Sequence, residues 1–346
     1  MVQDLVNALP ESLGLVSLDQ ERPHGQCNPK QLAIRNDWSS ALPDRPTTRF
    51  APAPTGYLHL GHVINAIYVW GLARVAGGRV VLRVEDHDRG RCRPEYETAM
   101  LDDLGWLGFE PDEPSTDDLL RGPSEFRQSD SDAVYAKALD GLRARGLAYV
   151  CDCSRTMFAR WAATHGRPWS GPSCPGGCRA RGLAPRPGIG GRVALGAGEE
   201  TFEDLLAGPQ AGDPSETGDL LVRERSGSWT YAFAVVVDDM RHGIDLVVRA
   251  RDLLPDTPRQ IRLGRLLGRA QAPSFAHHSL VLRPDGSKLS KAGRDTSVRE
   301  LRDAGWTAET LIGQAAAAVG LVAPGGRLEA REVSRLFASR ADRTMI

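Results

Sequence analysis

The alternation of apolar and polar positions changes its period several times after residue 46. Short apolar runs of strand-forming residues predict buried strands at 47–52, "TTRFAP", and at 79–86, "RVVLRVED". Between them Val63, Ile67 and Trp70 fall at helical spacing, and two glycines close the run. Because strand, helix and strand follow one another in this order, the pattern predicts an α/β domain built on a parallel sheet.

The later patterns divide the chain into five parts. Helices are predicted at 94–109, which opens on a proline, and at 131–146, and the short strand "AYVC" follows at 148–151. Glycine, proline and cysteine are then frequent up to about residue 215, which predicts a loop-rich insertion. The expected parts are an N-terminal extension, 1–46; the first half of the main domain, 47–150; the insertion, 151–215; the second half of the main domain, 216–293; and a short helical tail, 294–346.

Composition and charge exclude some classes of protein. Hydrophobic residues make up 41% and charged residues 25%, which is typical of a globular protein. We find no apolar run long enough to cross a bilayer and no secretory signal at the N-terminus, so we expect a cytoplasmic protein without membrane contact. The net charge of −1 argues against a surface coated with positive charge, although it permits a local basic surface. We expect a monomer.

The sequence His59-Leu60-Gly61-His62 lies where the first predicted strand leads into the first predicted helix. Ligands of parallel sheets bind at the carboxyl ends of the strands, and the start of a helix favours anions. Gly61 allows close approach to the backbone, and two imidazoles can donate hydrogen bonds to a phosphoryl group. The alternative interpretation of these four residues is a surface helix cap with incidental histidines.

Lysine is rare in this chain, with 4 lysines among 43 Lys and Arg residues. Two of them, Lys288 and Lys291, fall in the short motif "KLSK", shortly after the turn-forming sequence "RPDG". A compact ammonium, unlike the planar fork of arginine, suits a loop that closes over a polyphosphate and neutralises shifting charge. A solvated basic loop is the alternative interpretation.

Taken together and in this order, the two motifs resemble the paired signatures of class I aminoacyl-tRNA synthetases. The blocks "RFAPAPTGYLHLGH", "LRVEDHDR", "YAFAVVVDD", "VVRARDLLPDTPRQ" and "KLSK" are similar to successive blocks of the glutamyl-tRNA synthetase family, over roughly residues 47–293. The resemblance implies a Rossmann-like parallel sheet and ATP binding by His59, His62 and Lys291. Gly61 and Lys288 complete the catalytic motifs, and Mg²⁺ would arrive with ATP.

The same resemblance implies a site for glutamate, which has two carboxylates and one ammonium. Arg49 and Arg249 offer guanidinium forks for carboxylates, Glu85 is suited to the ammonium, and Tyr231 offers a hydroxyl. Ala53 also falls among the expected glutamate contacts, but the family often has serine there, so one hydroxyl contact is missing. The alternative for the charged residues is an ordinary strand end or a local ion pair, and for Tyr231 a place in the core.

Two further features concern the surroundings of that site. Ala250 and Arg251 depart from the family pattern, in which a small residue and then a small or acidic residue are usual. The acidic pair Asp238–Asp239 and the segment "EDHD" at 85–88 are candidates for metal binding, but we expect them to have structural or helix-end roles.

Four of the six cysteines are clustered, as Cys151-x-Cys153 and Cys174-x₃-Cys178. Without an export signal such a cluster favours a metal over disulfides. It resembles the zinc insertion of short members of the family, in which tyrosine often stands at the position of Cys174. We therefore expect one structural zinc ion, with four protein ligands and no open position. Free thiols or two disulfides are the alternatives.

Only 55 residues follow Lys291, too few for the helical anticodon-binding region that full-length members of the family carry there. The chain therefore resembles short paralogues of the family, which implies that glutamate is activated with ATP. The glutamyl group would pass to the queuosine base at the wobble position of tRNA(Asp). A rim at Arg155, Arg160, Arg179 and Arg181 is a candidate RNA contact, with a solvated surface as the alternative.

Two other functions remain open at this point. The same activation chemistry can serve another acceptor, either the 3′ end of a tRNA or a small amine. A noncatalytic tRNA-binding protein is the other possibility, but such proteins usually lose motif residues, and here His59, His62 and both motif lysines remain.

Overall fold

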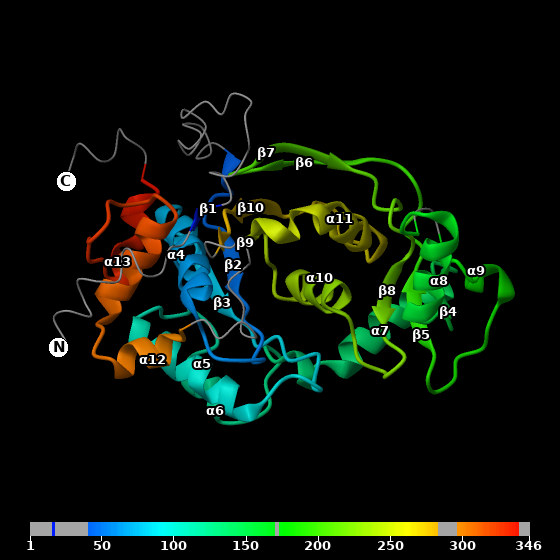
Figure 1. Cartoon of the computed structure of the whole chain (residues 1–346), viewed down its shortest axis with the longest axis horizontal. Coiled ribbons are helices and arrows are strands. Elements are labelled where there is room, and N and C mark those ends of the chain that lie inside the picture. Colours follow the sequence, from blue (N-terminus) through cyan, green and yellow to red (C-terminus); the bar gives the residue numbers. More distant parts are fainter. Residues whose placement is uncertain (1–15, 18–40, 170–172, 283–295, 339–346) are drawn as a thin grey trace.

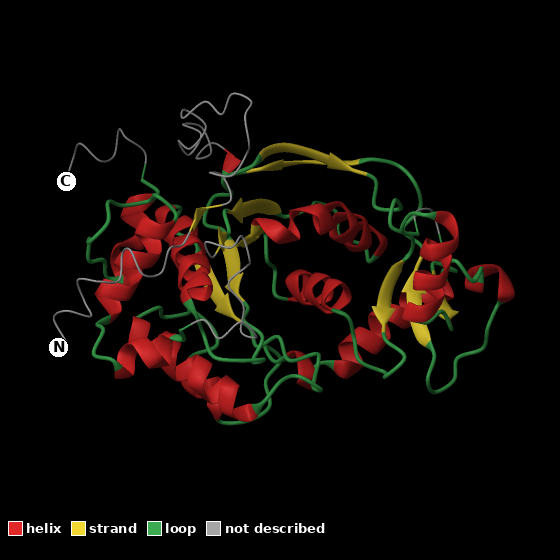
Figure 2. Ribbon diagram, in the orientation of Figure 1, coloured by secondary structure: helices red, strands yellow, loops and turns green. Residues whose placement is uncertain are grey.

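The computed structural model describes residues 16–17, 41–169, 173–282 and 296–338 (Figure 1). The main strands lie beside helix α4, and the cysteine-bearing elements lie at the opposite end of the molecule (Figure 2). Helices α10 (Tyr231–Arg241) and α11 (Thr257–Leu266) lie between these two regions. None of the described helices combines the length and the apolarity needed to cross a membrane.

A parallel βαβ unit forms the start of the main domain. Strand β2 (Thr47–Phe50) pairs in parallel with β3 (Arg79–Leu82), and α4 (Leu60–Val75) connects them. Helix α4 buries residues on nearly every side because the sheet and the C-terminal helices enclose it. Past its end, Gly77 has a φ of 65°, which a residue with a side chain rarely adopts. The predicted strand–helix–strand order is confirmed.

The largest sheet is mixed. Its order is β7-β6-β10-β9, in which β9 (Leu246–Ala250), β10 (Ser274–His278) and β6 (Glu200–Asp204) are parallel. Strand β7 (Gly208–Gly212) is antiparallel to β6, because the two form a hairpin. The expectation of a purely parallel sheet is therefore wrong at this edge, whose strands fall within the range expected for the insertion.

The βαβ unit and the larger sheet lie side by side through the start of β9. The backbone N–H of Asp245 donates to Thr47 O over 3.1 Å, and Thr47 N donates to Asp245 Oδ1 over 2.8 Å. Strand β2 is therefore flanked by β3 on one side and β9 on the other. The carboxyl ends of β2, β3 and β9 carry Arg49, Glu85 and Arg249 at or just past them.

Helices cover this framework. Helix α5 begins at the predicted proline, and the cluster of α7, α10 and β8 forms a second apolar core around Tyr135, Trp229 and Phe233. The helical elements between β3 and β10, outside the insertion, are α5 (Pro94–Leu107), α6 (Thr116–Leu120), η3 (Gln128–Asp130), α7 (Asp132–Ala144), α10 (Tyr231–Arg241), η4 (Arg251–Asp256) and α11 (Thr257–Leu266).

The cysteine-rich region has its own small antiparallel sheet of order β4-β5-β8. Its strands are β4 (Ala148–Cys151), β5 (Gly190–Val193) and β8 (Leu220–Arg223). Helices α8 (Arg155–His165) and α9 (Cys178–Arg181) lie beside it in Figure 1. Helix α8 has no buried residue, so this region has little apolar core of its own.

The described C-terminal part is helical and packs on the βαβ unit. Strand β11 (Val281–Leu282) pairs with β1 (Val16–Ser17), and α12 (Val298–Asp303), α13 (Ala308–Ala318) and η6 (Ala330–Leu336) follow. Phe337 lies against α4, where a Cβ on Gly71 would come within 2.1 Å of its ring. The glycine therefore creates the space that lets this segment approach α4.

Candidate active site and metal centre

The two histidines of the "HLGH" motif cap helix α4 and hold each other. His59 Nδ1 accepts the Gly61 N–H over 3.1 Å, and His62 Nδ1 accepts the His59 N–H over the same distance. Because a backbone N–H can only donate, each neutral ring carries its proton on Nε2. A Cβ on Gly61 would lie 3.0 Å from His59 Cε1, so glycine lets that ring fold back. The cap therefore fixes two Nε2–H donors at a helix start that favours anions.

The lysine motif, Lys288 and Lys291, lies outside the described residues. Before it, the described chain ends at Leu282 in β11. After it, the described chain resumes just before Ser297, which forms an antiparallel bridge with His59. The chain that follows the lysine motif therefore returns to the turn that carries the histidines.

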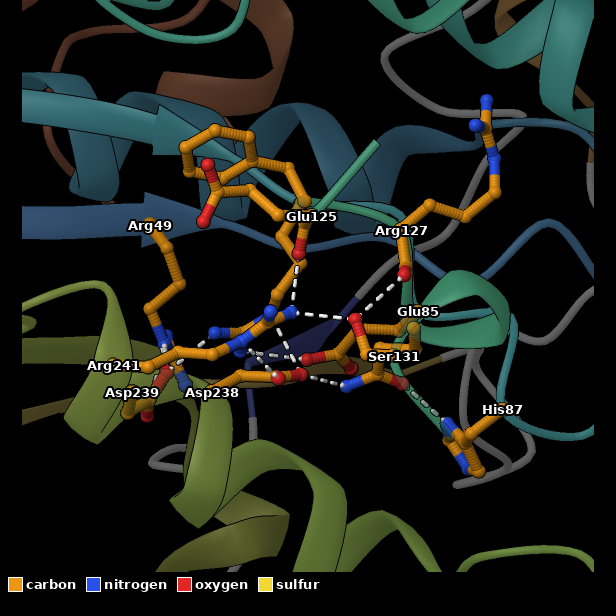
Figure 3. Close-up of polar contacts among 12 residues, drawn as sticks. Arg49, Glu85, His87, Glu125, Arg127, Ser131, Asp238, Asp239 and Arg241 are labelled. Carbon is orange, nitrogen blue, oxygen red and sulfur yellow. Dashed lines mark hydrogen bonds and ion pairs between the residues drawn. The ribbon is translucent and has the colours of Figure 1, made fainter. Parts of the chain in front are cut away.

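A buried chain of ion pairs joins Arg49 to Glu85. Arg49 Nε donates to Asp239 Oδ1 over 3.1 Å, and Arg83 Nη1 donates to the same oxygen over 2.7 Å. Arg83 Nη2 also donates to Glu85 Oε1 over 2.9 Å. Burial alone would raise the pKa of Asp239, but the guanidinium groups of Arg49 and Arg83 lower it below its usual value. Figure 3 shows Asp239 near Arg49 on one side of this network and Glu85 on the other.

The neighbouring carboxylate, Asp238, ties helix α10 to the elements around it. It accepts the Tyr135 hydroxyl over 2.9 Å, Gln128 Nε2 over 2.8 Å and Arg241 Nε over 3.0 Å. Burial and the charge of Asp238 raise the pKa of Tyr135. Asp238 is completely buried and held by protein groups, which fits the structural role expected for it.

The acidic segment at 85–88 also makes protein contacts. Asp86 accepts the Ser129 N–H over 2.7 Å, and His87 Nδ1 lies 2.6 Å from Gln128 Oε1. Asp88 accepts the Arg91 Nε–H over 2.6 Å. Within the described ranges, the group of side chains suited to hold a metal ion is the cysteine cluster, and this acidic segment forms none. These residues therefore shape the turn after β3.

Tyr231 begins helix α10 and lies within electrostatic reach of the other expected glutamate contacts. Burial raises the pKa of its hydroxyl, and the charges of Arg249, Glu85 and Arg49 also act on it. The structure thus gathers these four residues, which come from β2, the end of β3, α10 and β9. A site for glutamate, which carries two carboxylates and one ammonium, requires positive and negative side chains close to one another.

Arg249 differs from the other buried arginines of the site. Its Nε donates to His277 Nε2 over 2.9 Å, Nη1 to Gln260 Oε1 over 2.6 Å and Nη2 to Thr257 Oγ1 over 2.8 Å. The residue is 5% exposed, and no carboxylate of the described chain forms a salt bridge with it. The alternative of a local ion pair, for which Asp252 is the nearby acid, is therefore not realised in the described chain; neutral groups hold the guanidinium.

The departures from the family pattern lie next to these residues. Ala53 is half-buried in the loop after β2, and its carbonyl accepts the Thr55 N–H over 2.8 Å. Ala250 ends β9, and Arg251 begins η4 with an exposed side chain. Because both follow Arg249 directly, they border the carboxyl edge of the sheet.

The four clustered cysteines meet at one point. Their Sγ atoms all lie within 4.8 Å of one another, and none forms a disulfide. A tetrahedral zinc site with Zn–S bonds of about 2.3 Å places its sulfurs about 3.8 Å apart, so the thiols fit this metal. The cluster consists of Cys151, Cys153, Cys174 and Cys178.

Arginine side chains surround the sulfur cluster. Arg192 Nε donates to Cys151 Sγ over 3.3 Å, and Arg181 Nη2 to Cys178 Sγ over 3.4 Å. Burial opposes ionisation of Cys174, but a backbone N–H and the neighbouring thiols lower its pKa to about 7. The arginines and the backbone N–H favour the thiolate form that binds metal, and they act against the burial that raises the pKa of Cys153 and Cys178. A Cβ on Gly176 would lie 2.7 Å from Cys153 Sγ, so glycine is needed in this turn.

Some residues of the site could not be assigned from the sequence. Arg83 interrupts an apolar strand, and a charge at such a position signals a buried partner, but the partner Asp239 lies 156 positions away. Asp204 and His277 are 73 positions apart and meet only because β6 pairs with β10. Long-range pairs of this kind depend on the strand register.

Comparison with known proteins identifies the class of protein to which the chain belongs. The family model described as tRNA synthetases class I (E and Q), catalytic domain, matches residues 46–165 and 192–325. The chain belongs to this family, whose members are ligases of the aminoacyl-tRNA synthetase type.

Three named relatives are similar to the chain over most of its length. The chain is 42% identical to the Glutamyl-Q tRNA(Asp) synthetase of Symbiobacterium thermophilum over 286 residues, which are 79% of this chain and 86% of the relative. It is 39% identical to the protein of the same name from Nitratidesulfovibrio vulgaris, again over 79% and 86%. Glutamate–tRNA ligase 2 of Halorhodospira halophila is also 39% identical, but the match spans 77% of this chain and 55% of that protein.

A solved structure agrees with these matches. The glutamate tRNA ligase of Elizabethkingia meningosepticum, crystallised with its amino acid, superposes with a TM-score of 0.68 at 25% identity. The match covers 84% of this chain and spans 64% of that structure's chain. The catalytic fold of class I tRNA synthetases is therefore present.

Proposed function

We propose that this protein activates L-glutamate with ATP and transfers the glutamyl group to queuosine at the wobble position of tRNA(Asp). The two relatives named Glutamyl-Q tRNA(Asp) synthetase support the choice of acceptor, because the match spans most of their length. The observation that carries the choice of amino acid is Arg249, a buried cation without a carboxylate partner in the described chain.

A buried charge is costly unless an opposite charge accompanies it. Arg49 and Arg83 satisfy this condition through Asp239, whereas Arg249 has only neutral hydrogen-bond partners. A substrate carboxylate supplies the missing anion. Glutamate fits because its second carboxylate can bind Arg49 and its ammonium can bind Glu85.

Two more residues complete the glutamate site. The Tyr231 hydroxyl, whose raised pKa keeps it protonated, donates to the substrate. Ala53 contributes through its backbone, since its side chain has no hydroxyl. The amino acid is thus held by charge at both ends before ATP reacts.

In the activation step, the α-carboxylate of glutamate attacks the α-phosphorus of ATP and pyrophosphate leaves. The protein needs no side-chain nucleophile, because the substrate provides one, so catalysis consists of positioning and charge stabilisation. His59 and His62 donate Nε2–H groups to the phosphates, and Gly61 permits their approach. Lys288 and Lys291 neutralise the developing charge, and Mg²⁺ enters with ATP.

In the transfer step, a hydroxyl of the queuosine ring attacks the mixed anhydride and AMP leaves. The cysteine-rich region is the candidate RNA contact, because residues 153–198 contain seven arginines and no acidic residue, in a chain of net charge −1. Of the four rim arginines, Arg155, Arg160 and Arg179 are exposed, and Arg181 pairs with Asp152. One zinc ion on the four cysteines would hold this region in shape.

Glutamate-dependent exchange of pyrophosphate into ATP tests the first step. We expect exchange with L-glutamate and at least about 100-fold less with L-glutamine, whose amide cannot pair with a guanidinium as a carboxylate does. Absence of exchange with glutamate would remove the activation step, and a preference for glutamine would overturn the assignment of the substrate.

A further inference from the structure

Arg249 is one end of a buried hydrogen-bonded series that continues through His277 to Asp204. Arg249 and His277 are register partners on the parallel strands β9 and β10. The His277 ring accepts from Arg249 Nε over 2.9 Å through Nε2, and its Nδ1 lies 2.5 Å from Asp204 Oδ2. His277 is 2% exposed and Asp204 1%, so bulk water reaches neither.

The donors and acceptors of this series allow one arrangement of protons. A guanidinium can only donate, so His277 Nε2 must be the unprotonated nitrogen. The proton of the neutral ring therefore lies on Nδ1, and Asp204 accepts it. Asp204 is itself fixed, because its Oδ1 accepts the backbone N–H groups of Leu206 and Ala207 over 3.0 and 2.8 Å.

We propose that Asp204 and His277 are positioning residues for glutamate: they hold Arg249 by its Nε, and the N–H of Nη1 that Gln260 does not accept is left for the substrate carboxylate. This inference rests on the proposed role of Arg249. Asp204 fixes the tautomer of His277 and places a negative charge one residue away from the guanidinium. The charge attracts Arg249 without occupying the face that the substrate needs.

The charged groups around His277 all bear on its protonation. Burial lowers the pKa of His277, Asp204 raises it, and the positive charges of Arg249 and Arg49 lower it; the net shift is downward. Thr257 Oγ1, 3.3 Å from Nε2, and the stacked Phe275 ring are uncharged. The imidazole is thus neutral at pH 7. Acid would add a proton on Nε2, facing Arg249 Nε–H, and would break the hydrogen bond.

The test is Asp204→Asn, assayed by glutamate-dependent pyrophosphate exchange. An asparagine amide donates to His277 Nδ1 and moves the ring proton to Nε2, so two donors face each other at Arg249. We expect the KM for glutamate to rise about tenfold or more while kcat at saturating glutamate changes less than about threefold. The KM for ATP should not change.

Two variants of His277 separate positioning from packing. His277→Phe fills the space without a hydrogen bond, so the KM for glutamate should rise as in Asp204→Asn. His277→Gln can accept from Arg249 and donate to Asp204, so it should recover most of that loss. It should also abolish the rise in the KM for glutamate that we expect for the wild-type enzyme when acid protonates His277.

Asp213→Asn is the matched control, because Asp213 caps a nearby loop through Ser215 and lies outside the series. Equal KM values for Asp204→Asn and wild type would overturn the proposal, and so would equal losses in His277→Phe and His277→Gln. An inactive wild-type enzyme would instead refute the proposed function, so the two failures are distinguishable.

Discussion

At the scale of single residues, the site depends on buried arginines that differ in their partners. Arg83 is completely buried and lies between Glu85 and Asp239, so it compensates the charge of both. Arg249, by contrast, is held by neutral groups. The first arrangement stabilises the fold, and the second is the basis of the proposed role of Arg249 in binding a substrate carboxylate.

Replacing Arg83 by leucine should destabilise the protein strongly. The change leaves two buried carboxylates without their shared cation, which costs about 3–5 kcal/mol of unfolding free energy. Urea unfolding measures the loss. Arg91→Leu is the control, because the Arg91 side chain is 75% exposed and its pair with Asp88 contributes about 1 kcal/mol or less. Similar losses in both variants would contradict the account.

Replacing Arg249 by lysine should impair use of glutamate rather than folding. An ammonium cannot donate to His277, Gln260, Thr257 and a substrate carboxylate in the planar geometry of a guanidinium. We expect kcat/KM for glutamate to fall about 100-fold, which corresponds to about 2.7 kcal/mol. Arg225→Lys, at an exposed position, should change it less than about twofold. An unchanged kcat/KM in Arg249→Lys would remove this residue from the site.

The residue types at the site could be read from the sequence, but their partners could not. Arg49, Glu85, Tyr231 and Arg249 stand in blocks that resemble a known family, and the structure gathers them. The contacts of Arg83 with Asp239 and of His277 with Asp204 depend on strand and helix positions that no local pattern specifies. Residue patterns predict which groups are needed, while the tertiary fold decides which of them meet.

At the scale of elements, the cysteine-rich region has little apolar core and relies on its sulfur cluster. The cluster of buried residues there is made of three of the cysteines, with Tyr149, Phe158 and Leu183 packed against them. A metal ion would therefore supply stability that the side chains do not.

Metal analysis of the purified protein should find about one zinc ion per chain. Cys174→Ser should lose it and lower the melting temperature, because three thiolates and a hydroxyl bind zinc more weakly. Cys92→Ser, which leaves the cluster intact, should retain the full zinc content. Loss of zinc in Cys92→Ser but not in Cys174→Ser would refute the assigned ligands.

The contact between α5 and α12 contains a buried carboxylate with an unusual pKa. Asp103 is completely buried, its oxygens have no hydrogen bond within the described chain, and Arg299 Nε lies 3.9 Å away. Burial raises the pKa of Asp103 to about 6. Because the folded pKa exceeds the unfolded one, this group favours folding at low pH and loses that contribution as the pH rises.

Asp103→Asn should therefore stabilise the protein at neutral but not at acid pH. The gain should appear between about pH 4 and pH 6 and reach about 2–3 kcal/mol above pH 7, from two pKa units at about 1.4 kcal/mol each. Urea unfolding at several pH values measures it. Asp102→Asn, at the exposed neighbouring position, should show no such step; a step of the same size there would contradict the assignment.

The positions of helices and strands were largely predictable from the sequence, whereas the pairing of the strands was less predictable. The runs at 47–50 and 79–82 and the helix from Pro94 carry clear local periods, and the structure confirms them. Strands β6 and β7 lie in a glycine- and proline-rich stretch, so their hairpin at the edge of the large sheet gave no clear signal. Sheet order arises from contacts between distant segments, which short periods do not encode.

At the scale of the whole molecule, the two regions to which we assign different roles lie apart. The residues proposed to bind glutamate lie at the sheet edge, and the arginine-rich region around the cysteines lies at the other end of the molecule (Figure 1). The first part suits activation of an amino acid, and the second suits a polyanion such as RNA. From the sequence alone, the rim at Arg155, Arg160, Arg179 and Arg181 was a candidate RNA contact, and it stays a prediction.

The most direct measurement is the position of labelled glutamate on tRNA. The protein is incubated with ATP, radiolabelled glutamate and tRNA(Asp) that either carries queuosine or lacks it, and the product is digested with a nuclease. We predict label on the anticodon-loop fragment of the queuosine-containing tRNA and none on the other. Label at a 3′ end, or equal labelling of both tRNAs, would contradict the account.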